Sequence, residues 1–204
     1  MECGIGAQKR DDVVRAASLI RQERYEEAES LLDSVLSWFK ACMNDRGKTY
    51  ISVANREELA AIEKEHPDQA FVWIDDVSYG ETLHLKTFIA MAHRDLEEAL
   101  RRSNTVVQFR PYSAAVYIER GGILNQLRQP AKALVAYQKA LALAERFSSN
   151  ANMRAAALRG IGFTHVELKD LSSARRAIEQ SLKLDPDNKI ARQELNYITD
   201  MEKK

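Results

Sequence analysis

Apolar and small residues recur along this chain at spacings that predict antiparallel pairs of helices. The clearest pair begins at Ala155, where small residues occupy positions 8 and 20 of a 34-residue frame and a proline occupies position 32. Small residues let two helices approach closely, and the proline ends the second helix. The residues that fall on this frame are Leu158, Ile161, Gly162, His165, Ala174, Ile178, Ser181 and Pro186.

The same frame fits earlier segments of the chain. Placed at Ala114 it includes Gly121 and Tyr137, and placed at Gly80 it includes Leu83 and Leu96, among other positions. Near the start, the residues Leu19, Ile20, Tyr25, Ala28, Leu32 and Val35 keep the spacing of a hairpin over 9–42. The frames at Ala114 and Ala155 start 41 residues apart, so we expect residues 146–152 to form an extension of one helix and a loop.

A different pattern occupies residues 44–79. Two short β-branched and aromatic runs, 50–53 and 71–74, flank a segment in which Asn55 and Glu58 resemble the capping box of a helix that ends before Pro67. This pattern predicts a strand, helix, strand insert. Two strands alone are marginally stable in water, so we expect them to pack on the helices or to form a homodimer through the insert.

Two of the helical segments resemble the tetratricopeptide repeat family, through the run from Tyr137 to Leu141 and the helix exit from Leu182 to Asn188. A bacterial-type member with no specific identity is expected. The resemblance implies a mostly α fold, a solenoid of helical hairpins with the small insert and a C-terminal capping helix. The expected parts are a hairpin at 9–42, the insert at 44–79, and 80–201 with repeats 80–113, 114–147 and 155–188. The capping helix would cover the last repeat with Ile190, Leu195 and Ile198.

The family resemblance also implies a binding surface. Its members usually hold a peptide on a concave face built from the first helix of each repeat. In this chain, the predicted groove residues are His84, Phe88, Met91, Ile118, Asn125, Arg159, Phe163 and Val166. The implied function is a protein-interaction scaffold or adaptor with a protein or peptide partner. An equal alternative is that the insert or the first hairpin fills this apolar stripe.

The sequence also bears on functions other than a peptide-binding scaffold. Family members that capture the acidic end of heat-shock chaperones use a basic clamp, which is absent at the matching positions here. A chaperone of a secreted or membrane-inserting protein is an alternative. An enzyme would need a site at the insert, near Trp73, Asp75, Asp76 and Tyr79, where no nucleophile and base arrangement is evident. Lys86 and Arg120 occupy usually apolar positions, so they either extend to solvent or pair with acids such as Glu81, Glu119 or Asp75.

Composition narrows the partners. Thirty basic residues balance thirty acidic ones, which argues against nucleic acid. No run of eighteen apolar residues predicts a membrane span, and two cysteines are too few for a disulfide framework, so we expect a soluble protein in a reducing cytoplasm. The four histidines lack metal-ligand spacing, and the string from His93 to Leu96 is interpreted as a repeat turn. We expect no metal, cofactor or catalytic residue.

Overall fold

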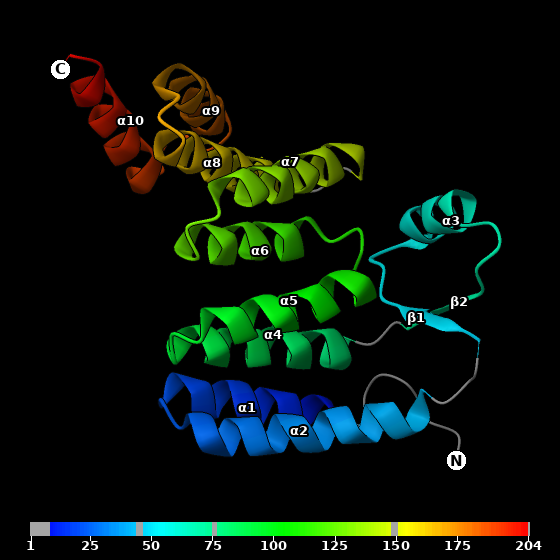
Figure 1. Cartoon of the computed structure of the whole chain (residues 1–204). Helices are drawn as coiled ribbons and strands as arrows, with labels where there is room; N and C mark the ends of the chain where they lie inside the picture. The colour runs from blue at the N-terminus through cyan, green and yellow to red at the C-terminus, as the bar shows by residue number, and fades with distance from the viewer. Residues whose placement is uncertain (1–8, 44–46, 75–76, 148–150, 204) are drawn as a thin grey trace. The chain divides into compact units, whose positions relative to one another are not determined.

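The computed structural model describes residues 9–43, 47–74, 77–147 and 151–203. The chain divides into two compact units, 1–112 and 113–204. The first contains the hairpin α1 (Arg10–Arg21) with α2 (Tyr25–Cys42) and the hairpin α4 (Val77–Ala92) with α5 (Leu96–Phe109). The second contains α6 (Ala114–Gln126) with α7 (Pro130–Arg146), α8 (Ala151–Glu167) with α9 (Leu171–Leu184), and α10 (Lys189–Glu202), as Figure 1 shows.

One turn geometry joins the two helices of every hairpin. Glu23, Arg94, Arg128 and Lys169 have positive φ angles of 59°, 60°, 58° and 62°. At the second turn, the Arg94 N–H donates to the Met91 carbonyl at 3.0 Å and the Asp95 N–H to the Ala90 carbonyl at 2.9 Å, and the other three turns repeat this pair of bonds. This arrangement satisfies carbonyls at the end of the first helix. All four turn residues fall at position 15 of a frame, so the hairpin at 9–42 follows the same repeat as the others.

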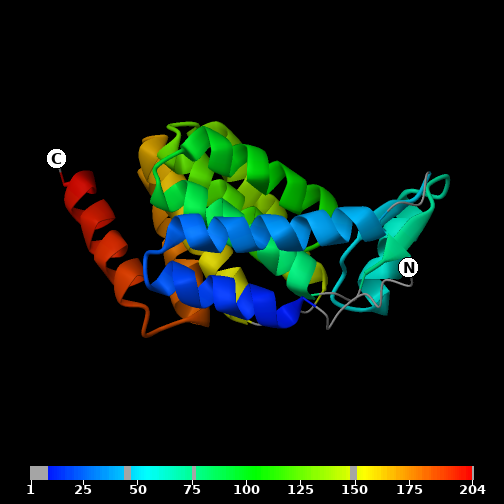
Figure 2. The same cartoon turned by 90° about the horizontal axis from the view of Figure 1, so that it is seen from below.

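Helices from both hairpins build the core of the first unit. Leu32, Val35 and Phe39 of α2 are almost fully buried, together with Ile89 of α4. The two helices α1 and α2 lie side by side in both views (Figures 1 and 2). The apolar positions that the spacing predicted in the first hairpin therefore do form its inner face.

The insert has the predicted order of strand, helix and strand. Strands β1 (Thr49–Ile51) and β2 (Phe71–Trp73) pair in parallel with Tyr50 opposite Val72, and α3 (Arg56–Glu65) connects them. The Asn55 side chain accepts a hydrogen bond from the Glu58 N–H at 3.0 Å, and the Glu58 carboxylate accepts one from the Ala54 N–H at 2.8 Å. These bonds satisfy donors at the start of α3, as a capping pair does.

The insert is attached to the helices of its own unit, at the end where α2 and α5 finish (Figures 1 and 2). The Ser52 N–H donates to the Phe109 carbonyl at 2.8 Å, and the Tyr112 hydroxyl donates to the Glu65 carboxylate at 2.6 Å. Ile51 and Ile74 are 1% exposed. The strands therefore gain their stability within the chain, and a homodimer through the insert stays a prediction.

Tyr137 of α7 organises the first hairpins of the second unit. Its ring packs directly on the backbones of Gly121 in α6 and Gly160 in α8, where a Cβ atom has no space. Gly162 is in equally close contact with Ile178 of α9. Three helical glycines thus provide the close approach that the repeat pattern predicted.

The long interval between the last two repeats contains the end of α7 and the start of α8. The sequence predicted an extension of one helix plus a loop over residues 146–152. Helix α7 ends at Arg146 and α8 begins at Ala151, and residues 148–150 lie outside the described part.

The last helix, α10, covers α9 as a cap. Ile198 and Ala191 are fully buried with Ile178 of α9, and Leu195 packs against this cluster. The expectation that Ile190 belongs to the covering side is wrong, because its side chain is 62% exposed. Ala191, the next residue, turns inward instead. These elements confirm the predicted fold class, while the predicted part boundaries stay a prediction.

Candidate functional site

Five of the eight predicted groove residues lie on two neighbouring helices of the second unit. Ile118 and Asn125 belong to α6, whereas Arg159, Phe163 and Val166 belong to α8. The Asn125 amide donates to the Thr164 hydroxyl at 3.0 Å and so joins the two helices. Asn125 also hydrogen-bonds Tyr137, which lowers the pKa of that phenol, although burial raises it overall. Asn125 therefore has a clear packing role beside any role in binding.

Two more of these five side chains, besides Asn125, are already engaged within the unit. The Arg159 guanidinium is 3.3 Å from an Asp185 carboxylate oxygen, and its side chain is 20% exposed. Val166 packs against the cluster formed by α9 and α10. Phe163 and Ile118 are half-buried. The accessible part of this surface is therefore mainly apolar.

The other three predicted residues belong to α4 in the first unit. His84, Phe88 and Met91 are spaced by four and three residues, which places them on one side of the helix. Phe88 is 46% exposed, and the other two are half-buried. A phenylalanine with this exposure on the first helix of a hairpin is available to a ligand.

Sequence reasoning missed a further row of side chains on α10. Ile190, Tyr197 and Met201 are 62%, 49% and 38% exposed. A signal for them was present: the frame that starts at Ala155 repeats at Lys189, 34 residues later, so α10 corresponds to the first helix of a further repeat and Tyr197 corresponds to Phe163. The helix was predicted only as a cap, so its outer residues were not considered.

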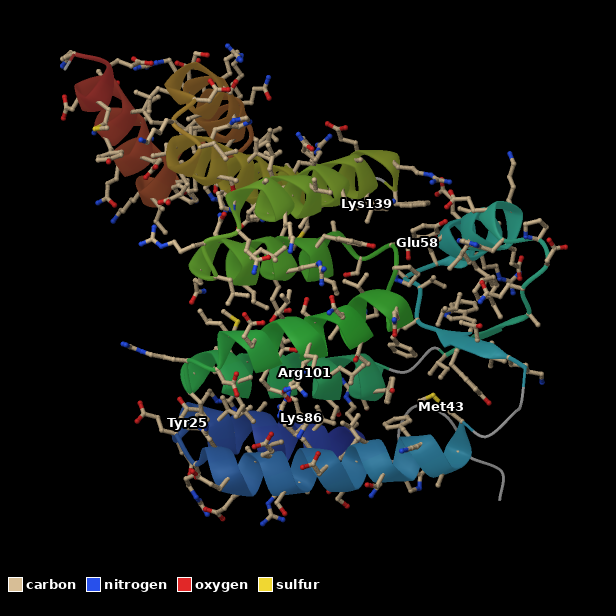
Figure 3. The ribbon with its side chains drawn as sticks, viewed as in Figure 1. Tyr25, Met43, Glu58, Lys86, Arg101 and Lys139 are labelled. Carbon is tan, nitrogen blue, oxygen red and sulfur yellow. The ribbon has the colours of Figure 1, made fainter. Side chains whose placement is uncertain are left out.

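A charged pocket of about 670 Å³ lies in the first unit, between α2, α4 and α5. Lys86 of α4, labelled in Figure 3, is 8% exposed, and its ammonium donates to Asp33 at 2.7 Å and to Glu29 at 3.1 Å. Arg102 of α5 donates to Glu29 at 2.8 Å and to Glu98 at 2.5 Å. Each cation therefore has two carboxylate partners, and the two cations share Glu29.

The predicted partners of Lys86 were incorrect. The sequence suggested Glu81, Glu119 or Asp75, but the acids come from α2, 57 and 53 residues away. Burial alone would raise the pKa of Glu29, but hydrogen bonds from Arg102 and Lys86 outweigh it and hold this pKa below its ordinary value. Arg120, the second cation at a usually apolar position, is half-buried. Burial raises the pKa of Tyr117, and the positive charge of Arg120 partly opposes this rise.

The residues proposed for an enzymatic alternative have structural contacts. The Trp73 indole donates to the Val53 carbonyl at 3.2 Å, and the Tyr79 ring lies 5.1 Å from Phe39 and 4.5 Å from Phe109 between ring centres. Asp75 and Asp76 lie outside the described residues. The Asp95 carboxylate accepts from the Glu98 N–H at 3.0 Å, so the His93–Leu96 string is a turn and helix cap, as predicted.

The described residues also bear on metal binding and on membrane insertion. In residues 9–43, 47–74, 77–147 and 151–203, no group of three or more His, Cys, Asp or Glu side chains is placed to hold a metal ion. No helix in the described part of the chain combines the length and apolar character needed to cross a membrane.

The tandem antiparallel hairpins and the small residues at their crossings define a helical repeat protein. Residues 112–187, a little over a third of the chain, match the family model described as Tetratricopeptide repeat. The chain is 31% identical over 115 residues to human Protein O-mannosyl-transferase TMTC3; this match covers 53% of the chain and 12% of that protein.

Solved structures share the fold. MamA from Desulfovibrio magneticus RS-1 superposes with a TM-score of 0.66 at 17% identity, over 98% of this chain and 88% of that one. The first repeat domain of Spaghetti (RPAP3), bound to the HSP90 peptide SRMEEVD, superposes with a TM-score of 0.54 at 22% identity, over 61% and 94%. These likenesses confirm the repeat architecture.

Proposed function

We propose that this protein is an interaction scaffold or adaptor that binds a peptide segment along the first helices of its hairpins. The observation that carries the proposal is the exposure of large apolar side chains on those helices, with Phe88 46% exposed on α4. An extended or helical segment would bury its own apolar side chains against them, while polar neighbours such as His84 set its register. The solved RPAP3 domain with its bound peptide supports such binding by this fold.

The exposure of Phe88 also bears on whether the protein fills its own groove. If the first hairpin or the insert covered the face of α4, this side chain would be buried like Leu85 and Ile89 of the same helix. Its exposure supports an open face in the first unit. We infer binding rather than catalysis, because the proposed enzymatic residues Trp73 and Tyr79 are used in packing.

Affinity capture tests the proposal. The intact protein and a variant with Phe88→Ser, Ile118→Ser and Phe163→Ser would be immobilised and exposed to extract of the native host. We expect a partner that the intact protein retains and the triple variant loses. Val135→Ser is the matched control, since Val135 is 65% exposed but lies on the second helix of its hairpin. Partners retained equally by all three proteins would contradict the proposal.

The alternative role as a chaperone of a secreted or membrane-inserting protein uses the same apolar face. It predicts that the captured segment is aggregation-prone when free and stays in solution in the complex. A light-scattering assay of the partner alone and with the protein distinguishes a chaperone from an adaptor. The homodimer through the insert is tested separately by analytical ultracentrifugation, where a monomer at high concentration would exclude it.

A further inference from the structure

One side of α10 presents a row of large side chains away from the core. Ile190, Tyr197 and Met201 are exposed, and Glu194 lies between them, at spacings of four, three and four residues. Residues at these intervals share one side of a helix. The buried contact with α9 is made by another side, which carries Ile198. The row is therefore not required for the packing of this unit.

Glu194 is the charged residue of this row. Burial raises the pKa of the Glu194 carboxyl, and the charge of Glu167 at the end of α8 raises it further. Val166 of α8 packs against the cluster that α9 and α10 form, so α8 lies beside α10 in this unit. Phe163 lies one helical turn before Glu167 on α8, as Ile190 lies one turn before Glu194 on α10.

Other acids of this unit are paired with a cation, whereas Glu194, among the described residues, is not. Glu167 pairs with Arg128 at 3.1 Å, and Asp200 pairs with Lys203 at 3.4 Å. In the described part of the unit no basic side chain forms an ion pair with Glu194, although the residue is half-buried. A partly desolvated carboxylate without a cation is unfavourable, and a cation supplied by a ligand would remove that cost.

We propose that this surface binds a peptide segment in which a lysine or arginine stands between large apolar side chains, with its positive charge on Glu194. The inference rests on the proposed function and deepens it by naming the partner's chemistry. The apolar side chains of the segment pack along the row, and the basic group sets its register. This surface, the α10 face, consists of Phe163, Val166, Ile190, Glu194, Tyr197 and Met201. Its preferred ligand is opposite in charge to the acidic ending of the peptide held by RPAP3.

A random dodecapeptide phage library, selected on the immobilised full chain, tests the inference. We expect enriched sequences with a lysine or arginine flanked by large apolar residues. The best synthetic peptide would then be measured by fluorescence anisotropy. Glu194→Lys should weaken its binding by about tenfold or more, and Tyr197→Ser should weaken it to a similar extent. Glu145→Lys is the matched control, an exposed charge reversal on α7 in the same unit, and should leave binding unchanged.

The outcomes separate the two proposals. Enriched peptides that are acidic or uncharged, or that bind Glu194→Lys as tightly as the wild type, overturn the basic-segment inference and leave the scaffold function intact. A library without any enriched peptide overturns both. Sedimentation supplies a second measurement: an oligomer that Tyr197→Ser converts into a monomer would show that a second copy occupies the α10 face, and would also overturn the inference.

Discussion

The ring of Tyr137 lies where a Cβ atom on Gly121 would stand, 2.7 Å from its Cε2 and Cζ atoms. Because Gly160 touches the ring from α8, the phenol has no room to move away. The neighbouring Gly122 is different: its Cβ would meet only the Tyr137 hydroxyl, at 3.7 Å. Two adjacent glycines in one helix thus have opposite packing environments.

Alanine at these two positions should therefore have opposite effects. We expect Gly121→Ala to lower the free energy of unfolding by about 1–3 kcal/mol, since overpacking outweighs the helix preference of alanine. Gly122→Ala should raise it by about 0.5–1 kcal/mol through that same preference. Urea unfolding followed by circular dichroism gives both values. Equal changes in the two variants would contradict the packing assigned to Tyr137.

The charged cluster of the first unit should contribute stability that depends on pH. Glu29 has a lowered pKa in the folded protein, so its stabilising effect is present above pH about 4.5 and is lost as the pH falls through the folded pKa. Glu29→Gln removes the charge-assisted bonds to Lys86 and Arg102, and should cost about 1–2 kcal/mol at pH 7. Thermal unfolding between pH 3 and 7 should show the difference shrinking toward acid.

Glu26→Gln is the matched control for this cluster. Glu26 is exposed on the same helix and is not part of the pocket. Its replacement should leave the unfolding temperature unchanged at each pH. A loss of stability at Glu26 equal to that at Glu29 would mean that total charge, rather than the cluster, is responsible.

Glycine in the hairpin turns should stabilise the protein. Lys169 has a φ angle of 62°, which is costly for a residue with a Cβ and favourable for glycine. We expect Lys169→Gly to raise the free energy of unfolding by about 0.5–1 kcal/mol. Gln180→Gly, at an exposed position within α9, should lower it by about 1 kcal/mol. Chemical denaturation of both variants checks the turn geometry, and a loss of stability in Lys169→Gly would contradict it.

Glu194 should have the reverse pH dependence to Glu29. Its folded pKa is raised, so its contribution is full below pH about 4.5 and is lost as the pH rises through that raised value. Glu194→Gln should therefore raise the unfolding temperature at pH 7, by about 1–4 °C, and have little effect at pH 4. Glu179→Gln, which removes a 3.7 Å pair with Arg175, is expected to give no gain. A lower unfolding temperature for Glu194→Gln at pH 7 would show that an attractive partner is already present.

The helical hairpins could be predicted from sequence because their determinants are local. Gly121 and Gly162 at helix crossings, and Asn55 with Glu58 at the start of α3, act on residues within one hairpin or one turn. The predicted groove residues on α6 and α8 lie on neighbouring helices because successive hairpins of a repeat array stack on each other, although their role in binding stays a prediction.

The contacts between separate elements could not be predicted in the same way. The acids that pair with Lys86 lie on α2. This pairing depends on how α4 packs against the hairpin that precedes the insert, and no fixed sequence spacing encodes that packing. Ile190 was assigned to the inner side of α10 on its apolar character alone. Its neighbour Ala191 is buried instead, in the cluster with Ala174 and Ile178 of α9.

The attachment of the insert affects how this repeat array can change in evolution. Helices α2 and α4 pack together in the core of the first unit although 34 residues separate the end of one from the start of the other. An inserted segment that leaves the neighbouring hairpins in direct contact adds little to the entropic cost of closing the loop between them. The array can therefore acquire or lose such a module between repeats without rebuilding the packing on either side, and carry an extra surface at almost no structural expense.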